Sequence, residues 1–245
     1  MIIDVHCHYG LWSFAMDKFE VDKIREYLDR FDVSKAIFSS AKGIVYDFAE
    51  GNRELIEFLE MDDRFLGYLV LNPNYFEESI REVEKYKENE KIIGIKFHPG
   101  YSKVPIDDKR ATEIVDCFSD TNLIYLIHTW GASMASQLAK LANKFPTVKF
   151  IMGHTGGDTW FDCLEIVKPY PNIYVEPCSS YADRDKLRVS IDTVGINRVL
   201  FGSDFTLINP AFVIGMVEGG GLTVEEKQTV YYKNAIKLLG GDIDA

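Results

Sequence analysis

The chain has 245 residues, of which 47% are hydrophobic and 27% charged, a composition typical of a soluble globular protein. Lys and Arg number 27 against 38 Asp and Glu, so the net charge is −11, which opposes binding to nucleic acid or to an anionic membrane. No apolar run has the length of a membrane span, and the first residues lack the basic region of a secretory signal. Four scattered cysteines without a CxxC pair fit a reducing compartment. We therefore expect a cytoplasmic protein without a nucleic-acid or membrane partner.

Short apolar runs, rich in β-branched and aromatic residues, alternate along the chain with polar stretches of helical spacing. The runs begin near Ile2, Lys35, Phe65, Ile92, Leu123, Val148, Ile173 and Arg198. Successive starts are about 24 to 33 residues apart, which is the length of one strand, one crossover helix and two loops. The pattern predicts a single-domain (β/α)₈ TIM barrel over residues 1–245, with a last helix from about Val224 to Leu239.

A doubly wound open sheet is the structural alternative, since it uses the same βα units. That fold binds nucleotides through a glycine-rich loop after its first strand, and neither GxGxxG nor GxxxxGK[ST] occurs there. Polar residues instead follow many of the predicted strands, which favours the closed barrel.

The histidines all follow predicted strands. They are His6, His8, His98, His128 and His154. A lone histidine at a strand end is more often a structural residue than a ligand, but the carboxyl ends of barrel strands form the active-site face. Because all five gather there, with the carboxylate of Asp204 after the eighth run, we interpret them as a metal site.

The first run predicts two of the metal ligands directly. Its alternation puts Asp4, His6 and His8 on the inner face of the barrel, and Ile3, Val5 and Cys7 on the helix side. Two imidazoles from one strand end can share a metal ion. We expect Asp4 to accept a hydrogen bond from a ligand imidazole.

The fourth run places Lys96 and His98 inward by the same alternation. Lys96 is open to three interpretations: a salt-bridged barrel residue, an anchor for a substrate carboxylate, or a carbamate that bridges two metals. We favour the free amine and one metal per chain. A pocket for an apolar or ring-bearing substrate is expected from the aromatic residues after the strands, Trp12, Tyr101, Trp130 and Tyr181.

The ordered motifs resemble the amidohydrolase superfamily, and most closely its amidohydrolase-related branch, which includes aminocarboxymuconate semialdehyde decarboxylase and small TIM-barrel hydrolases. The motifs are Asp4-Val5-His6-Cys7-His8, Gly94-Ile95-Lys96-Phe97-His98-Pro99, His128, Gly153-His154-Thr155-Gly156-Gly157 and Phe201-Gly202-Ser203-Asp204. The resemblance continues to Asn234-Ala235 in the last helix. It implies a divalent metal, most often zinc, held by His6, His8, His128 and Asp204, with His154 acting on the metal-bound water.

These residues predict hydrolysis of an amide, lactone or ester bond in a small molecule. Zinc lowers the pKa of a bound water to about 7, Asp204 can accept its proton, and His154 would polarise the substrate carbonyl or orient the water. Lys96, His98 and Trp130 are the expected substrate-binding residues.

Two other functions stay open. The first is nonoxidative decarboxylation of an aromatic or unsaturated acid, with Lys96 or Arg184 holding the carboxylate. The second is a noncatalytic metal-binding or scaffold protein. The sequence also leaves open whether the chain forms a homo-oligomer.

Overall fold

Parallel strands form one curled sheet in the order β1-β2-β3-β4-β5-β6-β7. The computed structural model describes residues 1–16, 19–179 and 181–241. Its strands are β1 (Ile2–Tyr9), β2 (Val33–Ser40), β3 (Phe65–Val70), β4 (Ile92–Phe97), β5 (Ile124–Trp130), β6 (Phe150–Gly156) and β7 (Ile173–Val175). Each strand pairs in parallel with the next one along the chain. Since every carboxyl end meets the same rim, polar residues that follow different strands are brought together.

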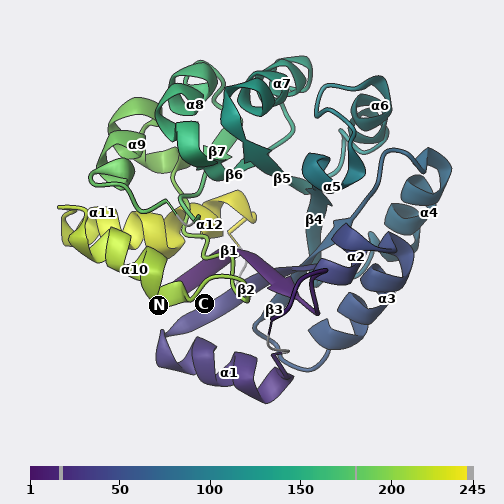
Figure 1. The fold of residues 1–245 in the computed structure, drawn as a ribbon, viewed down its shortest axis with the longest axis horizontal. Coiled ribbons are helices and arrows are strands. Elements are labelled where there is room, and N and C mark those ends of the chain that lie inside the picture. Colours follow the sequence, from purple (N-terminus) through teal and green to yellow (C-terminus); the bar gives the residue numbers. More distant parts are fainter. Residues whose placement is uncertain (17–18, 180, 242–245) are drawn as a thin grey trace.

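Helices connect the strands and lie around the outside of the sheet (Figure 1). They are α1 (Val21–Arg30), α2 (Ala41–Val45), α3 (Phe48–Leu59), α4 (Phe76–Tyr86), α5 (Pro99–Ser102), α6 (Lys109–Cys117), α7 (Gly131–Lys144), α8 (Trp160–Val167), α9 (Lys186–Val194), α10 (Pro210–Gly219), α11 (Val224–Gln228) and α12 (Asn234–Leu238), with short turns η1 (Gly157–Thr159) and η2 (Ile196–Arg198). In the described part of the chain, none of these helices is long and apolar enough to cross a membrane.

The predicted last helix is present, but a π-helical stretch divides it into two α-helical parts. Thr223 starts α11 with a capping box, in which its side chain and that of Glu226 bond each other's backbone N–H groups. A π-helical stretch, η3 (Thr229–Lys233), then leads directly into α12.

Residues 199–205, which include the predicted eighth strand, form an irregular segment. The backbone N–H of Leu200 donates to Val175 of β7, and the carbonyl of Phe201 accepts from Val5 of β1. The segment therefore lies between the first and last strands of the sheet, but it makes only isolated bridges to them. Of the eight predicted strands, seven are confirmed as regular strands, and the eighth position is occupied by this segment.

A small cluster of buried apolar side chains lies inside the curl of the sheet, whereas a larger cluster lies between the sheet and the helices. Ile3 and Val5 of β1 belong to the inner cluster, together with Ile151 of β6. Side chains from strands that are not neighbours can meet only within the curl. The prediction that Ile3 and Val5 face the helices is therefore wrong, although Cys7 does belong to the outer cluster.

A bulge in β1 explains the change of face. Asp4 pairs with Ala36 and Cys7 with Phe38, so three steps along β1 match two along β2. A bulge of this kind interrupts the alternation of side chains and re-aims those that follow it. Strict alternation, assumed from the sequence, cannot show where one extra residue is accommodated.

Candidate metal centre

His6 and His8 of β1 meet Asp204 of segment 199–205 at the carboxyl rim of the sheet. The Oδ1 atom of Asp204 lies 3.0 Å from Nε2 of His8 and 3.7 Å from Nε2 of His6. All three side chains are buried, and each offers one ligand atom within 4.8 Å of the others. A backbone hydrogen bond of 2.8 Å from Asp204 to the carbonyl of His6 holds the two segments in register.

This group has the chemistry of a divalent-metal site. Nitrogen and oxygen ligands of tetrahedral zinc, at about 2.0–2.2 Å from the ion, lie roughly 3.3–3.6 Å from one another, close to the separations seen here. Asp204 Oδ1 is buried and makes no hydrogen bond with any residue that the structure describes. A buried carboxylate oxygen is costly to leave without a partner, and a bound cation would satisfy it.

The protonation states favour cation binding. Burial, together with the charge of Lys96, holds the pKa of His6 well below its usual value, and burial also lowers the pKa of His8. Burial alone would raise the pKa of Asp204, but the contacts with His8 and His154 and the charge of Lys96 outweigh it, and the net shift is downward. Neutral imidazoles and an ionised carboxylate are the forms that bind metal.

Each of the two β1 imidazoles has a partner for its other nitrogen. Nδ1 of His6 lies 2.9 Å from Oε1 of Glu176, and Nδ1 of His8 lies 2.9 Å from Oγ of Ser39. These contacts turn both Nε2 atoms toward Asp204. Glu176 and Ser39 were not predicted as site residues, although both lie at the carboxyl ends of strands, as the histidines do, and that position could have indicated them.

Asp4 has a different place from the one predicted. Its carboxylate accepts hydrogen bonds from the backbone N–H and the hydroxyl of Ser203, and from the backbone N–H of His6 at 3.2 Å. None of these donors is an imidazole. Asp4 thus connects β1 to segment 199–205. The residue in contact with Nδ1 of the ligand imidazole, which was predicted to be Asp4, is Glu176.

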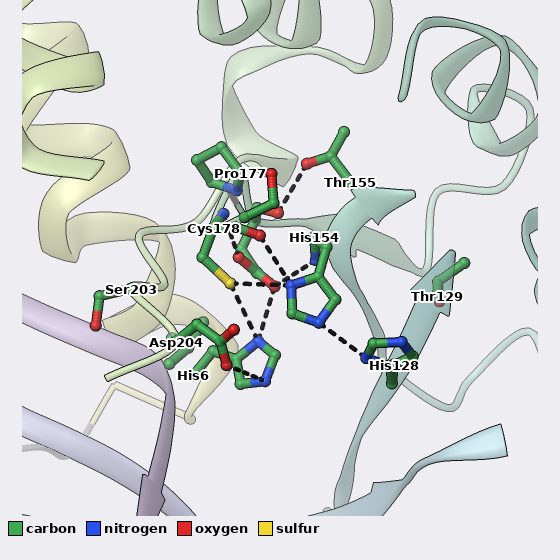
Figure 2. Close-up of polar contacts among 12 residues, drawn as sticks. His6, His128, Thr129, His154, Thr155, Pro177, Cys178, Ser203 and Asp204 are labelled. Atoms are coloured by element: carbon green, nitrogen blue, oxygen red, sulfur yellow. Dashed lines mark hydrogen bonds and ion pairs between the residues drawn. The ribbon is translucent and has the colours of Figure 1, made fainter. Parts of the chain in front are cut away.

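His154 and His128 lie beside this group. Figure 2 shows His154 between Cys178 and His128, with Nε2 of His154 2.9 Å from Nδ1 of His128 and Nδ1 of His154 2.8 Å from the carbonyl oxygen of Cys178. His128 stacks on His98, with ring centroids 3.9 Å apart. His128, a predicted ligand, is thus in contact with His154 and lies outside the group of His6, His8 and Asp204.

A second cluster of potential ligands shares His6. It contains His6, His154, Glu176 and Cys178, all buried, with ligand atoms within 4.8 Å of one another. The Sγ atom of Cys178 lies 3.4 Å from Nδ1 of both imidazoles. Hydrogen bonds within the protein already occupy the glutamate oxygens and both Nδ1 atoms, so this cluster is satisfied without an ion.

Lys96 lies against the ring of His6. Its Nζ atom is 2.8 Å from Nε2 of His6, and its side chain is fully buried. Burial lowers its pKa to about 8. The structure thus places Lys96 against a candidate metal ligand, and Lys96 is not among the residues that line the cavity at the mouth.

The cavity at this mouth has a volume of about 290 Å³ and an aromatic wall. His98 and Trp130, two of the predicted substrate-binding residues, line it, and His98 has a buried Nδ1 atom with no hydrogen-bond partner among the described residues. The other lining residues are His8, Trp12, Phe14, Tyr101, His128, His154, Ser179, Asp204, Leu207 and Ile208. Tyr181 does not line the cavity but contacts the ring of Trp130, with centroids 5.7 Å apart.

Solved structures with similar folds include both hydrolases and decarboxylases. An amidohydrolase from Burkholderia multivorans with bound zinc has a TM-score of 0.81 and 14% identity, covering 98% of this chain and 99% of that one. A dihydroxybenzoic acid decarboxylase from Polaromonas sp. JS666, with bound manganese and the inhibitor 2-nitroresorcinol, has a TM-score of 0.76 and 15% identity over 98% and 97%. A probable 2-pyrone-4,6-dicarboxylic acid hydrolase from Acinetobacter baumannii, with citric acid bound, has a TM-score of 0.76 and 13% identity over 98% and 99%.

Because the sequence identity is only 13–15%, these comparisons show a similar fold and no more. Among curated proteins, none matches the sequence of this chain. The family model described as amidohydrolase, Amidohydro_2, matches residues 3–241. This match covers nearly the whole chain and confirms the resemblance seen in its motifs. The chain belongs to the amidohydrolase family described by that model.

Proposed function

We propose that the chain is a metal-dependent hydrolase that acts on an amide, lactone or ester bond of a small molecule. The observation that carries this proposal is the Oδ1 atom of Asp204, a buried carboxylate oxygen without a hydrogen-bond partner in the described part of the chain, which faces Nε2 of His8 and of His6. Such an oxygen suits both a cation and the proton of an attacking water.

His6, His8 and Asp204 would hold the metal, and we include His128 as the fourth residue of the set. We favour zinc, one ion per chain, because imidazole nitrogens and a carboxylate are ligands that it accepts. When bound, a divalent cation lowers the pKa of a water molecule to about 7 and polarises a carbonyl group.

Asp204 and His154 would handle the proton. Asp204, ionised at neutral pH, accepts the proton of the water and transfers it to the leaving group. The carbonyl of Cys178 can only accept a hydrogen bond, so Nδ1 of His154 carries the ring proton and its Nε2 atom is an acceptor. Burial lowers the pKa of His154 to about 4. In this structure the Nε2 atom accepts from Nδ1 of His128, so His154 would orient the water by accepting its hydrogen bond only once that contact is broken, rather than polarise a carbonyl.

Nonoxidative decarboxylation is the second candidate. The aromatic wall formed by Trp12, Tyr101 and Trp130 favours a flat ring, and a decarboxylase of dihydroxybenzoic acid shares the fold. The cations predicted to anchor a carboxylate are absent from the cavity lining: Lys96 is buried against His6, and Arg184 is exposed and paired with Asp185. Hydrolysis, which needs no such anchor, agrees better with this site.

The test combines metal analysis with a substrate screen. Protein purified without chelator should contain about one divalent ion per chain, and His6→Ala or His8→Ala should remove it while the circular dichroism spectrum stays that of the folded protein. Turnover of an amide, lactone or ester that a chelator abolishes would support hydrolysis. Release of carbon dioxide from ring acids, with no hydrolysis, would support the decarboxylase. Bound metal without turnover in either panel would support the noncatalytic alternative.

A further inference from the structure

We propose that Glu176 is a positioning residue that holds two histidines of the site at once, His6 by its imidazole and His154 by its backbone N–H. The inference rests on the proposed function, since it assumes that His6 binds a cation through Nε2. Glu176 follows directly after β7 and its side chain is fully buried. None of the motifs recognised in the sequence includes it.

The carboxylate makes three contacts with the elements that build the site. Its Oε1 atom lies 2.9 Å from Nδ1 of His6 and accepts a hydrogen bond of 2.6 Å from the backbone N–H of His154. Its Oε2 atom accepts a hydrogen bond of 2.7 Å from the backbone N–H of Cys178. A single side chain thus connects β1, the end of β6 and the chain that follows β7.

These contacts favour one tautomer of His6. When Glu176 is ionised, both of its oxygens can only accept, so Nδ1 of His6 is then the donor of the contact between them. The ring proton of His6 then lies on Nδ1, and the lone pair on Nε2 is left on the side of Asp204 and Lys96. An imidazole held in this way by a carboxylate is also a stronger metal ligand.

The second contact supports an unusual backbone conformation. His154 has φ +63°, in the left-handed region that a residue with a Cβ rarely adopts. The bond from its N–H to Glu176 helps to hold the chain there. In this conformation the imidazole of His154 contacts the carbonyl of Cys178 and the ring of His128.

Space for the carboxylate is provided by the segment that carries Asp204. A Cβ atom on Gly202 would lie 3.0 Å from Oε2 and 3.1 Å from Cγ of Glu176. Only glycine at this position leaves Glu176 its present place without a shift. The glutamate therefore lies where β1, β6, β7 and segment 199–205 meet.

The test compares Glu176→Gln with Glu82→Gln. Glu82 is also buried and bonded to a side chain, but it belongs to α4 and contacts Asn52 rather than the site. An amide in place of Glu176 turns one acceptor into a donor that faces an N–H group. We expect Glu176→Gln to bind Zn²⁺ about 10–100-fold more weakly, measured with a competing chelator, and Glu82→Gln to match the wild type.

A second measurement does not depend on the variant. NMR of protein with ¹⁵N-labelled histidine identifies which ring nitrogen carries the proton. We expect His6 of the wild type to carry it on Nδ1 with and without Zn²⁺, and this preference to weaken in Glu176→Gln. A proton on Nε2 in the wild type overturns the proposal even if the variant does not fold.

The remaining outcomes are also decisive. Zn²⁺ affinity of Glu176→Gln within threefold of the wild type would show that the carboxylate does not position His6. A second bound ion per chain, lost in Glu176→Gln and in Cys178→Ala, would make Glu176 a ligand instead. If the wild type binds no divalent cation, the proposed function fails, and the tautomer of His6 still tests the inference separately.

Discussion

The Nζ atom of Lys96 lies 2.8 Å from Nε2 of His6, and the same Nε2 atom lies 3.7 Å from Oδ1 of Asp204. When Nδ1 of His6 carries the ring proton, Nε2 can only accept a hydrogen bond. Lys96 is then the donor, and it donates to the lone pair that a metal would use. Lys96 and a cation thus compete for one nitrogen, and the positive charge of the lysine adds electrostatic repulsion.

Lys96→Met should therefore bind Zn²⁺ more tightly than the wild type, by about tenfold for a change of roughly 1.4 kcal/mol. Methionine has a similar length and leaves no charge in this buried position. The number of ions should stay near one per chain. Two ions per chain in the wild type, reduced in Lys96→Met and also reduced in wild-type protein kept free of carbon dioxide and bicarbonate, would instead indicate a carbamate on Lys96.

Asp204→Asn should keep part of the metal affinity but lose catalysis. The amide can still occupy a ligand position, but it cannot accept the proton of a water, and we expect turnover of any substrate found in the screen to fall at least about 100-fold. His154→Asn should have a smaller effect if His154 only orients the water. Steady-state kinetics of the two variants with equal metal content decide this, and the reverse order would exchange their roles.

Gly202→Ala should disturb the site by steric contact alone. Its Cβ would lie 3.0 Å from Oε2 of Glu176 and 3.1 Å from Cβ of His6, so we expect weaker Zn²⁺ binding and a loss of about 1–3 kcal/mol of stability. Gly215, in α10, has no atom within 4 Å of the position of a Cβ. Gly215→Ala should leave Zn²⁺ binding unchanged and raise stability by roughly 0.5–1 kcal/mol. Chelator competition and thermal melts of both variants provide the comparison.

Asp62→Asn should reduce stability in a pH-dependent way. Hydrogen bonds from Arg64 hold the pKa of Asp62 far below its usual value, with a further contribution from Arg25. Because the pKa is lower in the folded state, the stabilisation is present above the unfolded value of about 3.9 and is lost as the pH falls through the folded value. We expect Asp62→Asn to cost about 1 kcal/mol at pH 7. Urea melts should show this difference shrink below pH 4, and a constant difference would contradict the prediction.

The order of strands and helices could be predicted from the sequence because it depends on local pattern. Short β-branched runs at regular intervals predicted the parallel strands, and the histidines that follow them predicted which rim carries the site. His6, His8 and Asp204 come together as that rule requires. The irregular segment 199–205 was the exception, since its bonds to β7 and β1 are isolated bridges rather than a ladder.

The bulge in β1 and the partners of the imidazoles could not be predicted in this way. Whether Val5 faces the helices or the inside of the sheet depends on how β1 pairs with β2, which is a contact between distant parts of the chain. Glu176 and Lys96 are 170 and 90 residues from His6, yet both touch its ring. Residue type and spacing determined which side chains could bind a metal; only the tertiary structure decided which of their nitrogens are free to do so, because hydrogen-bond geometry depends on distances that no local pattern encodes.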